Sequence, residues 1–200
     1  FTAVIIYKFL QDLNVSKNTR IISAYAYGLG TILFAYSLSS IKHNFSSLAI
    51  LLAIYLIFRY EYFSKRYLYL FCAGTAIGLA FLSELPVILI CFAYFIYQII
   101  IFYKDRNYAQ IIKNCLMVAI PVFISILVLF IFQGVVYGDP FVTGDQLFQR
   151  QQIELGKNGF SFSRNIFEGY YGLFLSPLKG LFWISPFLIS GFFGIHILYK

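Results

Sequence analysis

Long apolar stretches are the feature that most constrains how this chain folds. Seven such runs are present: Phe1–Leu10, Ile21–Ser40, Phe45–Phe58, Tyr67–Leu82, Pro86–Phe102, Cys115–Gln133 and Lys179–Leu198. A helix of about 20 apolar residues crosses a hydrocarbon layer about 30 Å thick. Helices also satisfy their own backbone hydrogen bonds, which a lipid environment requires. The pattern therefore predicts an all-α integral membrane protein with about seven transmembrane helices.

Composition and continuity support the same class. The chain is 60% hydrophobic and 12% charged, whereas soluble domains average about 25% charged residues. No internal repeat or linker divides it, so we expect residues 1–200 to form a single transmembrane bundle. The sequence starts in mid-helix without a methionine, and we expect it to be a fragment of a longer chain.

Charge placement predicts the orientation. If the runs alternate in direction, one set of loops carries ten basic residues: Lys8, Lys17, Arg20, Arg59, Lys65, Arg66, Lys104, Arg106, Lys113 and Lys200. The other set carries five: Lys42, Arg150, Lys157, Arg164 and Lys179. The positive-inside rule places the first set in the cytoplasm of a multi-pass cell-membrane protein. The net charge of +7 therefore does not indicate nucleic acid as a partner, because the basic residues lie in short loops and form no patch.

This orientation makes the 134–176 loop extracytoplasmic. A long loop in a tightly connected protein is usually functional. Within it, Gln146–Leu155 mixes apolar and polar residues, which predicts a short helix lying along the membrane surface. We expect the other outer connections, Ser40–Asn44 and Ser83–Leu85, to be tight turns.

Several segments, read in order, resemble a known family. They are Tyr27-Gly-Leu-Gly-Thr31, Gly78-Leu-Ala-Phe-Leu-Ser-Glu-Leu-Pro86, Tyr137-Gly-Asp-Pro-Phe-Val-Thr-Gly144 and Gly172-Leu-Phe-Leu-Ser-Pro-Leu-Lys-Gly-Leu-Phe182. Together they resemble the polytopic lipid-dependent glycosyltransferases of the C-type fold, a group that includes protein O-mannosyltransferases and aminoarabinose transferases. The resemblance covers most of the chain.

The resemblance implies transfer of a sugar from a polyprenyl-phosphate carrier to an extracytoplasmic acceptor, which is a protein, a glycan or a lipid. In that family the catalytic acid lies in the first outer loop, so we expect it upstream of Phe1 and assign no catalytic residue here. The three cysteines, Cys72, Cys91 and Cys115, lack metal-ligand spacing. No metal site is predicted, and no cofactor is assigned.

Three residues at predicted outer span ends are candidates for substrate binding. Lys179 begins the last run, where a helix N-terminus and a lysine favour a phosphate; the alternative is a lysine snorkelling to the interface. His43 is a candidate ligand for acceptor, phosphate or metal, or else a polar cap. Glu84 is nearly intramembrane, where ionisable groups are usually functional; an ion pair with Lys42 or Lys179 is the structural alternative. We expect Lys179, His43 and Glu84 to line one cavity.

The long loop adds two weaker candidates. Arg150 and Arg164 are able to hold a phosphate or a sugar acid bidentately, although solvated loop charge is the simpler interpretation. Asp139 precedes Pro140, which predicts a turn and not a catalytic group.

A different class of function stays open. The chain is alternatively a non-catalytic membrane subunit or a lipid or solute transporter. Transporters usually have repeats or interrupted helices around a site at mid-depth, whereas here the polar residues gather towards one face. This distribution favours chemistry at the membrane surface.

Overall fold

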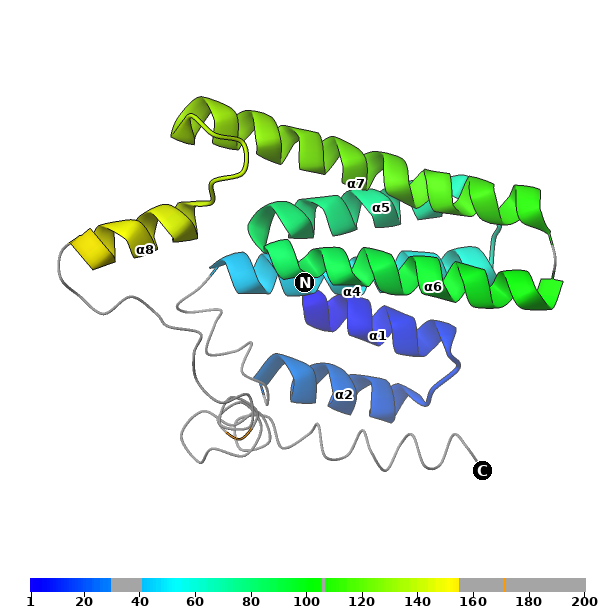
Figure 1. Ribbon diagram of the computed structural model, residues 1–200. Coiled ribbons are helices and arrows are strands. Elements are labelled where there is room, and N and C mark those ends of the chain that lie inside the picture. Colours follow the sequence, from blue (N-terminus) through cyan, green and yellow to red (C-terminus); the bar gives the residue numbers. More distant parts are fainter. Residues whose placement is uncertain (30–40, 106, 155–170, 172–200) are drawn as a thin grey trace.

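A computed structural model describes residues 1–29, 41–105, 107–154 and 171, and Figure 1 shows them as a bundle of helices. Within these residues six helices follow one another: α1 (Thr2–Asp12), α2 (Lys17–Leu29), α4 (Ile41–Tyr62), α5 (Tyr67–Ser83), α6 (Ile88–Asp105) and α7 (Tyr108–Tyr137). A 3-10 turn, η1 (Leu85–Val87), leads into α6, and α8 (Gly144–Glu154) follows α7. The predicted all-α class is confirmed for the described part of the chain.

Within the described residues two helical segments are long and apolar enough to cross a membrane, by length and composition, whereas the sequence predicted about seven spans. The two segments are His43–Tyr62, with 20 residues, and Tyr108–Tyr137, with 30 residues. The apolar helices Tyr67–Ser83 and Leu85–Ile100 are shorter. At 1.5 Å per residue α7 is about 45 Å long, which is more than the roughly 30 Å of a hydrocarbon layer. The predicted seventh span, Lys179–Leu198, lies outside the described residues.

Helix α5 is the central packing element, in contact with both α4 and α7. Its small residues allow the close approach to α7. A Cβ atom added at Gly74 would lie 2.5 Å from the carbonyl oxygen of Val118, and one at Gly78 would overlap the side chain of Ser125. Small residues four positions apart are a common means of bringing two membrane helices together.

The remaining helices pack around this pair. Helices α1 and α2 pack against each other, and α1 also contacts α4. Phe9 of α1 inserts between two α4 rings, with centroid distances of 5.8 Å to Tyr55 and 4.9 Å to Phe58. Helix α6 contacts α7 and contributes Cys91 and Tyr94 to the buried core. The ring contacts of Phe9 therefore attach α1, and α2 packed against it, to α4.

Capping residues define the two ends of α7 and the start of α8. The Asn107 side chain caps α7 by accepting a hydrogen bond from the Gln110 N–H (3.2 Å), and Gly138 ends it with a φ of +76°. Thr143 Oγ1 accepts from the Gln146 N–H (3.3 Å), while Gln146 Oε1 accepts from the Thr143 N–H (3.1 Å). This reciprocal capping box starts a helix, so the short helix predicted in this part of the loop is confirmed.

The turn predicted at Asp139 is also confirmed. The Asp139 carboxylate accepts a hydrogen bond from the Phe141 N–H (2.8 Å). The predicted loop Ser40–Asn44 was wrong from residue 41 onwards, because α4 already begins at Ile41. Polar residues such as His43 and Asn44 are tolerated in a first helical turn, where backbone groups still face solvent. Polarity alone therefore misplaced this helix start.

Because the helices alternate in direction, the bundle has two distinct ends (Figure 1). At one end α1, α4 and α6 finish and α2, α5 and α7 start; we call it the basic end. Its described residues include eight bases against three acids: Lys8, Lys17, Arg20, Arg59, Lys65, Arg66, Lys104 and Lys113 against Asp12, Glu61 and Asp105. The opposite end, which we call the Glu84 end, has among its described residues Lys42 and Arg150 against Glu84, Asp139, Asp145 and Glu154.

Candidate functional site

Two of the sequence-predicted site residues meet at the Glu84 end. His43 lies in the first turn of α4, and Glu84 lies in the junction between α5 and η1. The two residues are 41 positions apart, yet His43 Nδ1 and Glu84 Oε1 are joined by a hydrogen bond. Their side chains are 41% and 27% exposed. This contact joins the two ends of separate helices into one polar site.

The backbone around Glu84 explains its position. Glu84 is extended, with φ −146° and ψ 111°, so it interrupts the helical path between α5 and η1. Its N–H donates to the Ala80 carbonyl (2.9 Å), and its carbonyl accepts from the Val87 N–H (3.1 Å). Pro86 stands at the start of η1, where its missing N–H costs nothing. The predicted turn therefore presents the carboxylate at the end of the bundle.

The chemistry available at this pair is acid–base and hydrogen-bonding chemistry. An imidazole beside a carboxylate is held in one orientation, with its proton position set by the partner. Such a pair is suited to binding sugar hydroxyls or to moving a proton, if a substrate comes within hydrogen-bond reach. Partial exposure leaves both side chains accessible.

The other predicted site residues fall into two groups. Arg150 is exposed on α8, close in sequence to the capping box. Lys179 and Arg164 lie outside the described residues, as does the predicted cavity wall that Lys179 would form. The side chains of Lys42 and Lys179, the alternative ion-pair partners of Glu84, lie outside the described part of the structure, within which Glu84 contacts His43.

Sequence reasoning missed a buried polar cluster near the basic end, formed by Tyr60, Tyr67, Gln98, Gln110 and Asn114. The Tyr60 hydroxyl donates to Asn114 Oδ1 (2.6 Å) and accepts from Gln110 Nε2 (2.7 Å). The Tyr67 hydroxyl donates to Gln110 Oε1 (3.3 Å), and Asn114 Nδ2 donates to Gln98 Oε1 (3.3 Å). The cluster joins α4, α5, α6 and α7.

A signal for this cluster was present in the sequence. Gln98 and Asn114 are isolated amides in apolar surroundings, and they are 0% and 5% exposed. Buried polar groups need hydrogen-bond partners, so each amide predicts a contact with another helix. The spacing of residues along one helix does not identify the partner of each amide, because the contacts join separate helices.

A second ionic contact ties α1 to α4 at the basic end. Arg59 Nε lies 3.6 Å from Asp12 Oδ2, and the Tyr55 hydroxyl donates to the same carboxylate oxygen (2.9 Å). Arg59 also lies over the rings of Tyr55, Phe63 and Tyr69. These contacts hold the N-terminal helix pair and offer no obvious reaction chemistry.

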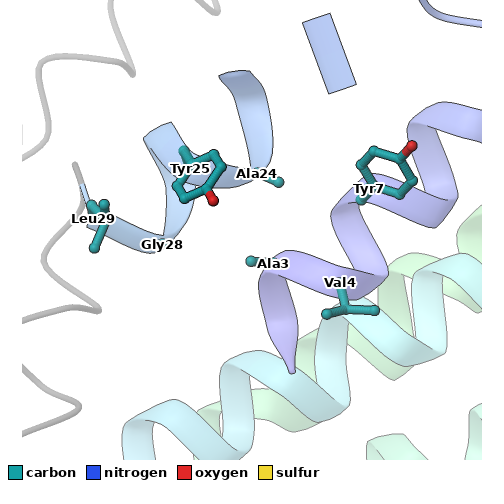
Figure 2. Close-up of a pocket in the computed structure, with 7 residues that line it drawn as sticks. All are labelled: Ala3, Val4, Tyr7, Ala24, Tyr25, Gly28 and Leu29. Carbon is teal, nitrogen blue, oxygen red and sulfur yellow. The ribbon is translucent and has the colours of Figure 1, made fainter. Parts of the chain in front are cut away.

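A cavity of about 440 Å³ lies between α1 and α2. Figure 2 shows its lining, in which the small residues Ala3, Ala24 and Gly28 leave space between the two helices. The rest of the lining is aliphatic or aromatic. Because no ionisable cluster converges there, the cavity does not extend the candidate site.

Comparison with known proteins does not assign the chain. No protein-family model, curated protein or solved structure matches it.

Proposed function

We propose that this chain is the membrane bundle of a glycosyltransferase that moves a sugar from a polyprenyl-phosphate carrier to an acceptor at the Glu84 end. The observation that carries the proposal is the contact between His43 and Glu84. Glu84 belongs to a segment that resembles lipid-dependent glycosyltransferases, Gly78–Pro86, and His43 lies at another predicted outer span end. Their contact brings two predicted substrate-binding residues into one site.

A lipid environment is supported by the outward surface of the bundle. Large apolar side chains on α6 and α7 are more than half exposed, among them Leu89 (65%), Phe123 (59%) and Ile131 (66%). Soluble monomers rarely expose such surface in quantity. The proposed arrangement is therefore a multi-pass protein whose basic end faces the cytoplasm and whose 134–176 loop is extracytoplasmic.

Each candidate residue has a distinct proposed role. Glu84 and His43 hydrogen-bond sugar or acceptor hydroxyls, while Lys179 holds the carrier phosphate as that phosphate becomes the leaving group. A lysine at a helix N-terminus stabilises a developing phosphate charge.

The test is transfer of radiolabelled sugar from polyprenyl-phosphate donors in membranes that contain the full-length protein. Glu84→Gln keeps the size of the side chain but removes its charge, and we expect transfer to fall about tenfold or more. Lys179→Ala is expected to weaken binding of polyprenyl phosphate, whereas Lys200→Ala serves as the matched control. Unchanged transfer in Glu84→Gln, with the wild-type protein active, would contradict the proposed site.

The alternative class, a transporter or a non-catalytic subunit, is favoured by one observation. The buried amides of the Tyr60 cluster are polar groups inside the bundle, as a permeation path requires. Uptake of labelled solute into proteoliposomes separates the two proposals. Transport without sugar transfer would favour this second candidate.

A further inference from the structure

The apolar cavity between α1 and α2 has features of a ligand site of its own (Figure 2). Small residues keep it open, among them Ala3 on α1 and Ala24 and Gly28 on α2. The helices remain close at Gly28, where an added Cβ atom would lie 3.8 Å from the Ala3 Cβ. Among the described residues no charged side chain lines the cavity, and its volume of about 440 Å³ is in the range of small-molecule sites. We call this space the α1–α2 cavity.

A cation adjoins the α1–α2 cavity on the side of the basic end. On α2, Arg20 lies one turn before Ala24 and two turns before Gly28, so the three residues share one face of the helix. Arg20 also lies over the ring of Tyr7, another lining residue, with its Cζ atom 5.3 Å from the ring centroid. The apolar space therefore borders on the guanidinium group from both helices.

The basic residues of α1 and α2 are not neutralised within the described part of the chain. The two helices contain three bases and one acid: Lys8, Lys17 and Arg20 against Asp12. Asp12 faces Arg59 of α4, with an Oδ2–Nε distance of 3.6 Å, and no described carboxylate pairs with any of the three bases. The Arg20 Nε is buried and has no acceptor among these residues. Because a buried donor without a partner is costly, an anion from outside the protein would stabilise this end.

The distance from Arg20 to the far end of the cavity matches one leaflet of a bilayer. Arg20 and Leu29, the last lining residue, are nine positions apart on α2, which corresponds to about 14 Å along the helix. Half of a hydrocarbon layer is about 15 Å thick. In the lipid environment proposed above, the cavity therefore runs along the acyl chains of one leaflet, and Arg20 lies towards the phosphates of that leaflet.

We propose that the α1–α2 cavity holds an acyl chain of an anionic phospholipid, whose phosphate binds Arg20 and Lys17. Lys17 lies three residues before Arg20, on the same side of α2. An anionic headgroup is favoured over a zwitterionic one, because the bases lack acid partners. Anionic lipids are enriched in the cytoplasmic leaflet, the side that the orientation proposed above gives to the basic end. The site needs a lipid environment but no sugar transfer, so it stands or falls independently of the transferase proposal.

The headgroup contact is tested on the full-length protein, purified in a maltoside detergent without a sugar donor. Phosphatidylglycerol or phosphatidylcholine is added, and the lipid retained per protein is counted by native mass spectrometry. The wild type is expected to prefer phosphatidylglycerol. Arg20→Gln should retain about fivefold less of it and lose the preference, whereas Arg20→Lys keeps the charge and the preference. The matched control is Arg66→Gln, which removes one exposed charge from the same end.

The acyl-chain contact is tested by filling the cavity. Ala24→Leu adds an apolar side chain to the lining, so retention of both lipids should fall while any remaining preference for phosphatidylglycerol persists. Ala93→Leu, at an exposed position of α6, adds the same volume outside the cavity. Thermal unfolding of all variants confirms that the bundle is intact. Equal retention by Arg20→Gln and Arg66→Gln, or by Ala24→Leu and Ala93→Leu, overturns the proposal.

Discussion

The two ends of the bundle differ in how deeply their polar side chains are buried. At the Glu84 end, His43 and Glu84 are partly exposed and meet at short helix ends. At the basic end, Gln98 and Asn114 are buried and bonded across four helices. Buried hydrogen bonds are costly to break, because the freed groups do not reach water. The basic end is therefore held by hydrogen bonds between helices, whereas the His43–Glu84 contact lies partly in solvent.

Between the two ends, α5 and α7 pack closely against each other. Gly74 and Gly78 let α5 lie directly against α7, and both helices extend from one end to the other. Substitutions at the α5–α7 contact, in the buried amide cluster and at the α1–α4 contact test this difference.

The largest effect is expected at the middle contact. Gly74→Ala places a methyl group 2.5 Å from a backbone oxygen of α7, and overpacking of this kind costs about 3 kcal/mol. Gly134→Ala is the control, because a Cβ there meets nothing within 4 Å and alanine favours a helix over glycine. Thermal unfolding in detergent should be lower for the first variant and unchanged or higher for the second. Equal unfolding temperatures would show that α5 and α7 do not pack this closely.

A smaller effect is expected within the buried cluster. Tyr60→Phe removes the hydroxyl that bonds Asn114 and Gln110, which leaves two buried amides short of a partner. The expected loss is about 1–3 kcal/mol of unfolding free energy. Tyr62→Phe in the same helix is the control, because Tyr62 is 73% exposed. If both variants unfold alike, the cluster does not hold the basic end together.

The smallest effect is expected where α1 joins α4. Asp12→Asn removes the charge that faces Arg59 at 3.6 Å but keeps an oxygen for the Tyr55 hydroxyl. Arg59 is 37% exposed, so solvent screens the pair, and the expected loss is at most about 1 kcal/mol. Unfolding followed by denaturant measures it, with Glu154→Gln on exposed α8 as the control. A loss as large as that of Tyr60→Phe would place the stabilising centre at α1 instead.

The sequence predicted the helices better than their contacts. Apolar run length placed some helices within a few residues, as the run Tyr67–Leu82 against α5 shows, but it placed α7 less well, because the run Cys115–Gln133 covers only its middle. The predicted run is shorter than α7 at both ends. At the N-terminal end this is because polar residues such as Asn107 and Gln110 occur at helix starts as well as in loops. The spacing of Gly74 and Gly78 was a readable signal for close packing, although only the structure identifies α7 as the partner.

The sequence identified His43 and Glu84 as candidate site residues but did not predict their contact. His43 and Glu84 stood out because ionisable groups are rare near apolar runs. Their contact depends on how α4 and α5 lie side by side, and no local pattern sets that arrangement. The amide cluster was not predicted, because its members lie on separate helices and only partner geometry distinguishes a network from isolated polar residues.

The claim that the Glu84 end faces outside and the basic end faces the cytoplasm is tested most directly by single-cysteine labelling in intact cells. The background replaces Cys72, Cys91 and Cys115 by alanine, and one cysteine is introduced as Asp139→Cys or Arg66→Cys, at two exposed positions on opposite ends. A membrane-impermeant maleimide is expected to label Asp139→Cys in intact cells and Arg66→Cys only after permeabilisation. Labelling of Arg66→Cys in intact cells, with Asp139→Cys protected, would contradict the orientation and the proposed site of sugar transfer together.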